Sequence, residues 1–260
     1  MDKSRAGTGR RAGGHSKAGY IGLAALGLLL FATFIGLGTW QVERRSWKLA
    51  LIARVDERVH AAPIAAPGPK EWPNVTAAHD EYRHVRLKGH LLNEKETLVY
   101  TATDLGPGYW VMTPLERDDG TIVLIDRGFV PIDRRDPATR PKGQVQGEVT
   151  ITGLLRISEP GGTLLRSNEP GRNRWYSRDV AAIAKARHLS NAAPYFVDAD
   201  STPNPGGLPV GGLTRIHFRN AHLQYAITWF AMALLVIVGA FVIVRQEKKP
   251  NLDETADEDA

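Results

Sequence analysis

Two long apolar stretches dominate the pattern of hydrophobic and polar positions along this chain. The first runs from residue 20 to 38 and the second from 223 to 244, and neither contains a charged residue. A helix needs roughly 20 residues to cross the hydrocarbon core of a bilayer, so both are long enough. Basic residues precede the first stretch, as in a signal peptide, but it is long for one and no Ala-x-Ala cleavage pattern follows. The pattern therefore predicts membrane-spanning helices over 20–42 and 220–244.

Basic residues set the expected orientation of the two spans. In residues 1–19 they outnumber the single acidic residue, Asp2, and more of them follow the second span. The positive-inside rule then places both ends in the cytoplasm. Three basic residues just beyond the first span oppose this, but a long translocated loop largely escapes the rule. We expect cytoplasmic tails at 1–19 and 245–260, and a periplasmic domain over 43–219.

Between the spans, the pattern changes to that of short strands. Val85 and Leu87 alternate with charged residues, and the apolar run 121–125 follows an Asp-Asp-Gly turn signal. One helix is expected over 180–188, capped by Asp179. Further strands are expected over 97–100, 109–112 (ended by Pro114), 149–155 and 194–197, and from Trp175. Six or seven strands with one helix predict an α+β membrane protein whose periplasmic domain is a mainly antiparallel barrel or sandwich.

Composition excludes several classes of function. The chain has no cysteine, which rules out disulfides, thiolate metal sites and covalent haem attachment through Cys-x-x-Cys-His. The net charge of +5 is spread out, with no basic run interleaved with aromatic residues, so nucleic acid is not an expected partner. The nucleophile elbow, the P-loop and the His-Glu-x-x-His pattern are all missing. A membrane-anchored periplasmic enzyme is therefore the least favoured interpretation.

A histidine lies where the second apolar stretch begins. Asn220 is a favourable N-cap residue, so His222 is expected in the first helical turn, and Tyr225, Ala226 and Trp229 share its face. An aromatic belt with one interfacial polar residue accounts for this face. An axial ligand for haem iron accounts for it equally well, because neutral imidazole binds iron readily and ionisable groups at membrane depth are costly to keep. These residues leave both interpretations open.

In the haem interpretation, His222 binds the iron while Tyr225 and Trp229 flank the macrocycle and Ala226 leaves room for it. The propionates would point towards the helix N-terminus, which favours anions. A single axial ligand is exchangeable, which suits a carrier better than a store. Two basic residues lie just upstream and are available to pair with the propionates, namely Arg215 and Arg219.

Small residues in the first apolar stretch predict that the two helices pack closely, with Trp40 near the depth of His222. Thr33 and Thr39 are expected to hydrogen-bond across the pair. The glycines expected at the interface are Gly22, Gly27, Gly36 and Gly38.

Asp126, Arg127 and Gly128 directly follow the apolar run 121–125. In a continued strand Asp126 and Arg127 point to opposite faces, so they are not expected to form an ion pair. The glycine permits a bulge or turn, and we interpret the segment as structural.

Several short motifs lie between residues 37 and 230. They are Leu37-Gly38-Thr39-Trp40-Gln41 with Arg44 and Trp47-Lys48, Glu81-Tyr82-Arg83 with Gly89, Thr113-Pro114-Leu115, Gly120, Arg127-Gly128-Phe129-Val130-Pro131, Pro194-Tyr195-Phe196, and Asn220-x-His222-Leu223-Gln224-Tyr225-Ala226 with Thr228-Trp229. Together they resemble the Surfeit locus one family (Shy one in yeast), membrane proteins needed to assemble haem–copper cytochrome oxidases. One departure is Asp126, where the family usually has Asn.

The resemblance implies a role in maturing oxidase subunit I, with haem a as transient cargo and His222 as its ligand. The expected partners are then subunit I, haem a synthase and the lipid bilayer. The leading hypothesis is a haem a-binding assembly factor, a chaperone of the respiratory chain rather than an enzyme. The alternative is a scaffold that stabilises subunit I without binding haem.

Overall fold

The computed structural model describes most of the chain, namely residues 17–163, 165–214, 216 and 220–247. It divides into two units. We call the first the helix pair, which comprises the chain up to Leu51 together with the chain from Phe218. We call the second the β domain, which comprises Ile52–His217.

Two long helices, α1 (Lys17–His60) and α4 (His222–Glu247), carry the apolar stretches. The segments expected to form a first helix and a separate continuation are one unbroken helix of 44 residues. Both helices are long and apolar enough to cross a membrane, and few of their apolar side chains are buried. Such side chains need an apolar solvent, so both helices are candidate membrane spans, as expected.

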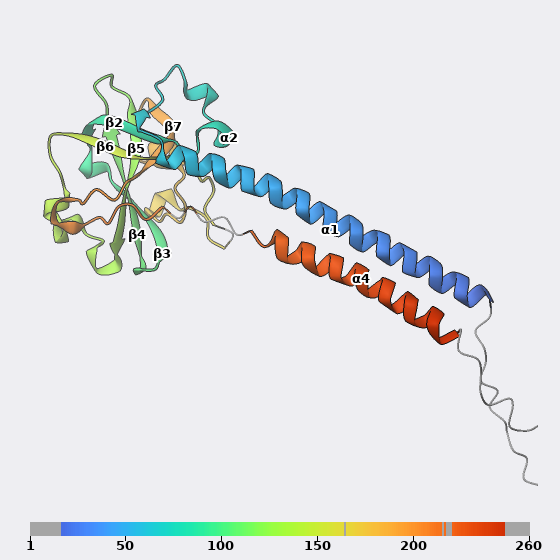
Figure 1. Ribbon diagram of the computed structural model, residues 1–260. Coiled ribbons are helices and arrows are strands. Elements are labelled where there is room, and N and C mark those ends of the chain that lie inside the picture. Colours follow the sequence, from blue (N-terminus) through green and yellow to red (C-terminus); the bar gives the residue numbers. More distant parts are fainter. Residues whose placement is uncertain (1–16, 164, 215, 217–219, 248–260) are drawn as a thin grey trace, which may run out of the picture. The chain divides into compact units, whose positions relative to one another are not determined.

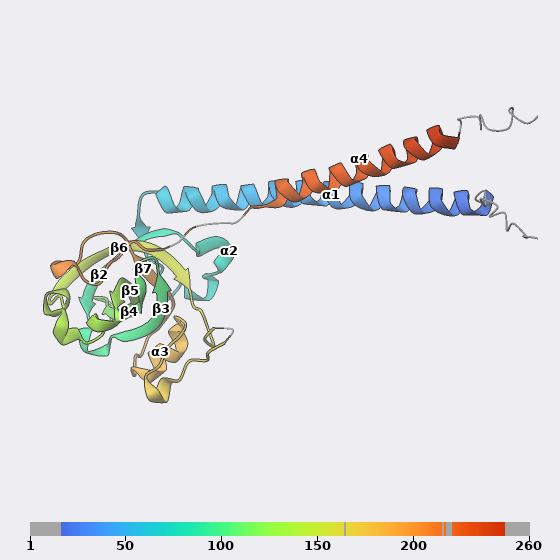
Figure 2. The same ribbon diagram turned by 90° about the horizontal axis from the view of Figure 1, so that it is seen from below.

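Within the helix pair, α1 and α4 lie side by side (Figures 1 and 2) and meet through one stripe of residues on each helix. Phe34 of α1 stacks on Trp229 of α4, with ring centroids 5.8 Å apart. A Cβ at Gly38 would lie 2.6 Å from the Phe230 ring, so a larger residue there would have to displace that ring. Ala226, one turn from Trp229, is 1% exposed. The predicted close packing therefore depends on one glycine.

Other interface predictions for α1 are wrong. A Cβ at Gly22, Gly27 or Gly36 would meet nothing within 4 Å. Thr33 and Thr39 donate hydrogen bonds to carbonyls four residues earlier in α1, at 2.8 and 2.9 Å, rather than across the pair. Threonine commonly bonds back to its own helix in this way when no partner is near, which removes the need for an interhelical acceptor.

The β domain is a closed, mainly antiparallel sheet with one packed helix, which confirms the expected fold class (Figure 1). The strand order is β1-β2-β6-β7-β5-β4-β3, and an additional pairing of β2 with β4 closes the barrel. Two pairs, β1 with β2 and β5 with β7, are parallel. The strands are β1 (Ile64–Ala65), β2 (His84–Leu91), β3 (Thr97–Thr103), β4 (Gly106–Glu116), β5 (Ile122–Pro131), β6 (Glu148–Ile157) and β7 (Ala192–Ala199).

Two further α-helices and several 3-10 helices lie between these strands. Helix α3 (Val180–Ala186) lies outside the barrel in Figure 2, and the Asp179 side chain caps it by accepting from Ala182 N at 3.0 Å, as predicted. The other α-helix is α2 (Ala77–Asp80). The 3-10 helices described are Trp72–Asn74, Asn93–Lys95, Ile132–Arg134, Pro137–Thr139, Pro141–Gly143, Pro170–Arg172 and Pro205–Gly207.

Strand β5 separates two apolar clusters because its side chains alternate between faces. Val123 and Ile125 enter one cluster with Tyr195 of β7. Leu124 enters the other cluster, in which Trp175 and the α3 residue Ile183 pack against the sheet. All six side chains are nearly inaccessible to solvent. The central strand thus anchors both the barrel interior and the helix outside it.

Two strand boundaries differ from prediction. Pro114 was expected to end a strand, but β4 continues to Glu116. A proline lacks only its N–H, and the Pro114 carbonyl still accepts from Leu92 N at 2.8 Å. Trp175 was expected to begin a strand, but it forms only an isolated bridge with Val99. Its indole is 2% exposed, so packing rather than sheet pairing accounts for its aromatic character.

Candidate functional site

The candidate ligand histidine is the first residue of α4 and has one defined partner. His222 Nδ1 lies 2.7 Å from Gln41 Oε1, on α1 of the same unit. An amide oxygen only accepts, so Nδ1 carries the proton and donates it to Gln41. In the neutral ring, Nε2 then holds the lone pair. This tautomer is the one that an imidazole needs to bind a metal through Nε2, with its other nitrogen fixed by a hydrogen bond.

Helix geometry explains why Gln41 reaches this histidine. Phe34, Gly38 and Gln41 are spaced by four and three residues, so they form one stripe along α1. The first two contact Trp229 and Phe230 of α4, which fixes the facing surfaces of the helices. Gln41 lies one turn further along the same stripe and meets the first turn of α4. The close contact at Gly38 therefore positions the amide that orients His222.

The other residues of the predicted haem face differ in exposure. Tyr225 is 55% exposed and Trp229 is partly buried against Phe34. Ala226 was expected to leave room for a macrocycle, but it is buried to 1% exposure, so no open space lies over it. The two arginines expected to pair with propionates, Arg215 and Arg219, lie outside the described residues.

The expected N-cap of α4 is absent. The helix begins at His222, and Asn220 Oδ1 is buried without a hydrogen-bond partner. The first backbone bond of the region runs from Tyr225 N to Ala221 O, at 3.2 Å. Asn220 precedes the N-cap position by one residue, so its side chain does not reach the free amides of the first turn.

Where the chain is described, no group of three or more histidine or acidic residues could hold a metal ion. His222 is therefore not part of a fully protein-bound metal site within these residues. Sequence reasoning placed Gln41 in a motif but missed its contact with His222. The available signal was a polar amide at the end of an apolar stretch, where an uncharged hydrogen-bonding group needs a partner.

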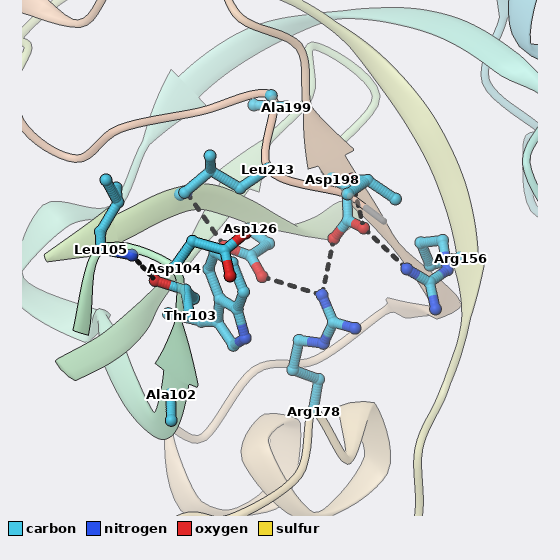
Figure 3. A pocket seen from close by; sticks show the side chains of 14 residues that line it. Ala102, Thr103, Asp104, Leu105, Asp126, Arg156, Arg178, Asp198, Ala199 and Leu213 are labelled. Carbon is cyan, nitrogen blue, oxygen red and sulfur yellow. Dashed lines mark hydrogen bonds and ion pairs between the residues drawn. The ribbon is translucent and has the colours of Figure 1, made fainter. Parts of the chain in front are cut away.

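A second polar site lies in the β domain, around a cavity of about 350 Å³ (Figure 3). Asp126 of β5 and Asp198 of β7 both accept from one guanidinium nitrogen, Arg178 Nη1, at 3.1 and 2.9 Å. Arg156 of β6 donates to Asp198 at 2.9 Å, and Glu159 accepts two hydrogen bonds from the Arg178 side chain. Sequence reasoning missed this cluster, because its members come from four separate segments.

Burial and charge shift the acid–base properties of this cluster. Burial and the charge of Asp198 raise the pKa of Asp126 to about 7, although Arg178 opposes the rise. Burial alone would lower the pKa of Arg178, but Asp198 and Asp126 raise it above its ordinary value. Burial alone would raise the pKa of Glu159, but the hydrogen bonds from Arg178 and the charges of Arg178 and Arg156 together lower it. The cluster therefore keeps both a permanent cation and a carboxyl group that gains a proton near neutrality.

Arg127 and Gly128 have the structural role that the sequence predicted. Arg127 points away from Asp126 and donates to Gly143 O and Asn204 Oδ1, at 2.6 and 2.9 Å. Burial lowers its pKa to about 10. Gly128 has a φ of +117°, and a Cβ there would lie 2.0 Å from Val210 O. These contacts hold the loop after β7 against β5.

Two candidate membrane helices and a small closed barrel, with a histidine at the start of the second helix, define a class of two-helix β-domain proteins. Comparison with known sequences narrows the class. The family model described as "SURF1 family" matches residues 28–234. The chain is 42% identical to Surfeit locus protein 1 of Mus musculus over 222 residues, covering 79% of this chain and 70% of that protein. It is 39% identical to the Homo sapiens protein over 224 residues, covering 79% and 72%. The chain belongs to the SURF1 family.

Proposed function

We propose that this chain is an assembly factor for haem–copper cytochrome c oxidase that binds haem a and assists its insertion into subunit I. Membership of the SURF1 family supports the assembly role. The observation that carries haem binding is the imidazole of His222, held by Gln41 with its Nε2 lone pair available. A neutral imidazole of this tautomer is a standard axial ligand of haem iron.

The residues of the helix pair have distinct parts in this proposal. His222 supplies the axial nitrogen, and Gln41 keeps the proton on Nδ1 and holds the ring plane. Tyr225 is exposed beside it and offers an aromatic face to the macrocycle. Arg215 and Arg219 are proposed as partners of the propionates on charge alone. The bound group would supply an iron centre that accepts one protein nitrogen.

A single axial nitrogen favours transfer over storage. His222 belongs to no group of three or more histidine or acidic residues that could hold a metal ion among the described residues. In this proposal it supplies one bond to iron, and only that bond has to break on release. We place the helices in a bacterial inner membrane with both ends in the cytoplasm and the β domain in the periplasm. There the chain would receive haem a from its synthase and pass it to subunit I. The proposed role includes no catalytic step by the chain itself.

The test compares haem loading of three chains purified from cells that make haem a. We expect His222→Ala to lose most of the haem a that the unmodified chain carries, measured from the pyridine haemochrome spectrum per mole of protein. His79→Ala is the matched control, since that histidine is exposed on α2 in the other unit, and it should load normally. Unchanged loading of His222→Ala would remove the ligand role. Co-purification with subunit I from haem-free preparations would favour the scaffold alternative.

A further inference from the structure

Another cavity of the β domain, of about 300 Å³, lies at one end of the barrel. Its lining includes the last residue of β2, the last residue of β7, the early part of β6 and the later part of β5. Two ladders bring these strand ends together, since His90 pairs with Glu148 and Gly153 pairs with Ala199. We call this cavity the barrel mouth, and the mouth of a β-barrel is a common place for a small ligand.

The walls of the barrel mouth continue the apolar interior of the barrel. Leu91 belongs to the same buried cluster as Val123 and Ile125. Three partly buried residues that pack against this cluster also line the cavity, namely Val145, Val149 and Ile151. A ligand in the barrel mouth would therefore meet branched aliphatic side chains.

Arg127 brings a positive charge into these apolar surroundings. Side chains of a strand alternate between its faces, so Arg127 follows Val123 and Ile125 towards the barrel interior. Arg127 is 2% exposed, and no other polar side chain of the cavity lining is buried. A buried charge is costly unless it is paired, so the partners of this guanidinium decide what the cavity can bind.

Within the described residues, the Arg127 guanidinium contacts neutral oxygens and no carboxylate. Nη2 donates to Gly143 O and Asn204 Oδ1, at 2.6 and 2.9 Å, and Nη1 donates to Asn93 Oδ1 at 3.4 Å. A guanidinium has five N–H donors, so one on Nε and one on Nη1 have no acceptor in the described part of the chain. Arg127 therefore has donors available for a ligand and lacks a directly bound negative charge.

The charges around Arg127 do not make up for this lack. Burial lowers the pKa of Arg127 to about 10, and the charge of Glu96 opposes this effect while that of Arg140 adds to it. Both oxygens of Glu96 already accept hydrogen bonds from Arg140. By contrast, carboxylates in direct contact raise the pKa of Arg178, the arginine beside Asp126. A bound anion would give Arg127 the kind of partner that Arg178 has within the chain.

We propose that the barrel mouth binds one carboxylate carried on a short branched alkyl group. A free branched-chain acid and the C-terminal apolar residue of a polypeptide share this chemistry. The carboxylate lies at Arg127 and accepts from its available N–H groups, in a charge-assisted hydrogen bond. The alkyl group packs against the aliphatic walls, where its removal from water is favourable. The site lies in the β domain and does not rest on haem binding at His222.

A phosphate group or a long-chain fatty acid fits the barrel mouth less well. Arg127 carries one positive charge, and Asp200, which also lines the cavity, would repel a second negative charge. Asp200 forms no ion pair with Arg127, and its Oδ1 accepts from Thr202 N at 2.9 Å. A cavity of about 300 Å³ is at the lower end of the range for ligand pockets, so it accommodates a short alkyl group rather than a long chain.

The first test is calorimetric titration of the full chain, in a non-ionic detergent at neutral pH, with isovalerate and with isovaleramide. The amide has nearly the same shape and no charge. We expect isovalerate to bind and isovaleramide to bind more weakly by about tenfold or more, because a hydrogen bond to a charged group is the stronger one. Inorganic phosphate should also bind more weakly than isovalerate. Equal binding of isovalerate and its amide, or phosphate binding as tight as that of isovalerate, would overturn the proposal.

A second pair of ligands separates the two sources of the carboxylate. N-acetyl-leucine presents its carboxylate as a chain terminus does, and N-acetyl-leucinamide lacks the charge. Binding of N-acetyl-leucine but not of its amide would support a polypeptide C-terminus. Binding of isovalerate without N-acetyl-leucine would support a free acid. If neither carboxylate binds, the proposal is wrong.

Two variants test the charged and apolar parts of the site. Arg127→Gln should weaken isovalerate binding by about tenfold or more, whereas Arg174→Gln, at an exposed arginine outside the cavity, should bind normally. Val145→Ala leaves the guanidinium in place and shortens one wall, so it should reduce the preference for isovalerate over acetate.

Arg127 also holds two loops, so circular dichroism must show that Arg127→Gln is folded. Unchanged isovalerate affinity in the folded variant would refute the role of the charge. If Arg127→Gln does not fold, Val145→Ala and the amide ligands decide. An unchanged preference for isovalerate over acetate in Val145→Ala would refute the placement of the alkyl group.

Discussion

The hydrogen bond between Gln41 and His222 offers the sharpest test of the haem proposal. Gln41→Met keeps the length of the side chain and removes the oxygen that accepts from His222 Nδ1. Within the described residues, the His222 ring makes this one hydrogen bond. Without it the imidazole is free to rotate and to exchange tautomers, so Nε2 is no longer held ready for iron.

The expected magnitude follows from the role of this single bond. Removing the hydrogen-bond partner of a metal-binding histidine costs about 10- to 100-fold in metal affinity, or about 1.4 to 2.7 kcal/mol. The helix pair should remain intact, because its contacts at Gly38 and Trp229 are unchanged. Gln41→Glu restores an acceptor with a stronger charge and should recover most of the affinity.

Haem affinity is measured by titrating haem into the apo full chain in detergent and following the Soret band. The control is Gln224→Met, the same substitution at an exposed position of α4. If Gln41→Met binds haem as tightly as the unmodified chain while His222→Ala does not bind it, the orienting role of Gln41 is refuted. If all the variants bind equally, the ligand is elsewhere.

Three predictions concern the β domain. The free energy of unfolding should fall as the pH rises from 4 to 7, by at most about 1.4 kcal/mol per pH unit. Folding raises the pKa of Asp126 from 3.8 to about 7, so in this range only the folded chain keeps that proton. Asp126→Asn should abolish this slope in urea titrations. Gly128→Ala should cost on the order of 3 kcal/mol in the same assay, since its φ is +117° and its Cβ would clash with backbone. Glu96→Gln should cost about 3 to 5 kcal/mol, since it leaves Arg140, with a side chain 1% exposed, without its carboxylate.

Matched substitutions separate these effects from general damage. Gly120 also has a positive φ, but a Cβ there would meet no atom within 4 Å. Gly120→Ala should therefore cost about 1 to 2 kcal/mol, less than Gly128→Ala. Glu148→Gln breaks the exposed pair with Lys88 and should change stability little. Equal costs within either matched pair would contradict the packing and burial arguments. An unchanged pH slope in Asp126→Asn would assign the proton to another group.

The sequence predicted those parts of the fold that depend on local pattern. The apolar lengths identified both long helices, and the alternation in 85–88 and the apolar run 121–125 identified β2 and β5. The Asp179 cap was also predicted, because capping joins residues only a few positions apart. The strand boundary at Pro114 was predicted wrongly, because a missing N–H is costly only where a neighbouring strand needs it as a donor.

The candidate site was predicted only in part. His222 was identified because a titratable group at a membrane boundary is conspicuous in a sequence. Its partner Gln41 is 181 residues away, and no periodicity relates the two. The room over Ala226 was predicted wrongly, because exposure of a small residue depends on the facing helix.

Burial can be inferred from the sequence of this chain, since apolar runs and alternation follow from the separation of side chains from water. Which residues pair with one another was decided only by the tertiary structure. The parallel pairing of β5 with β7 brings Asp126 beside Asp198, and the pairing of β2 with β4 closes the barrel. The physical reason is that hydrophobic patterning is non-directional, whereas hydrogen bonds and ion pairs require particular atoms to meet, and the folded backbone alone brings those atoms together.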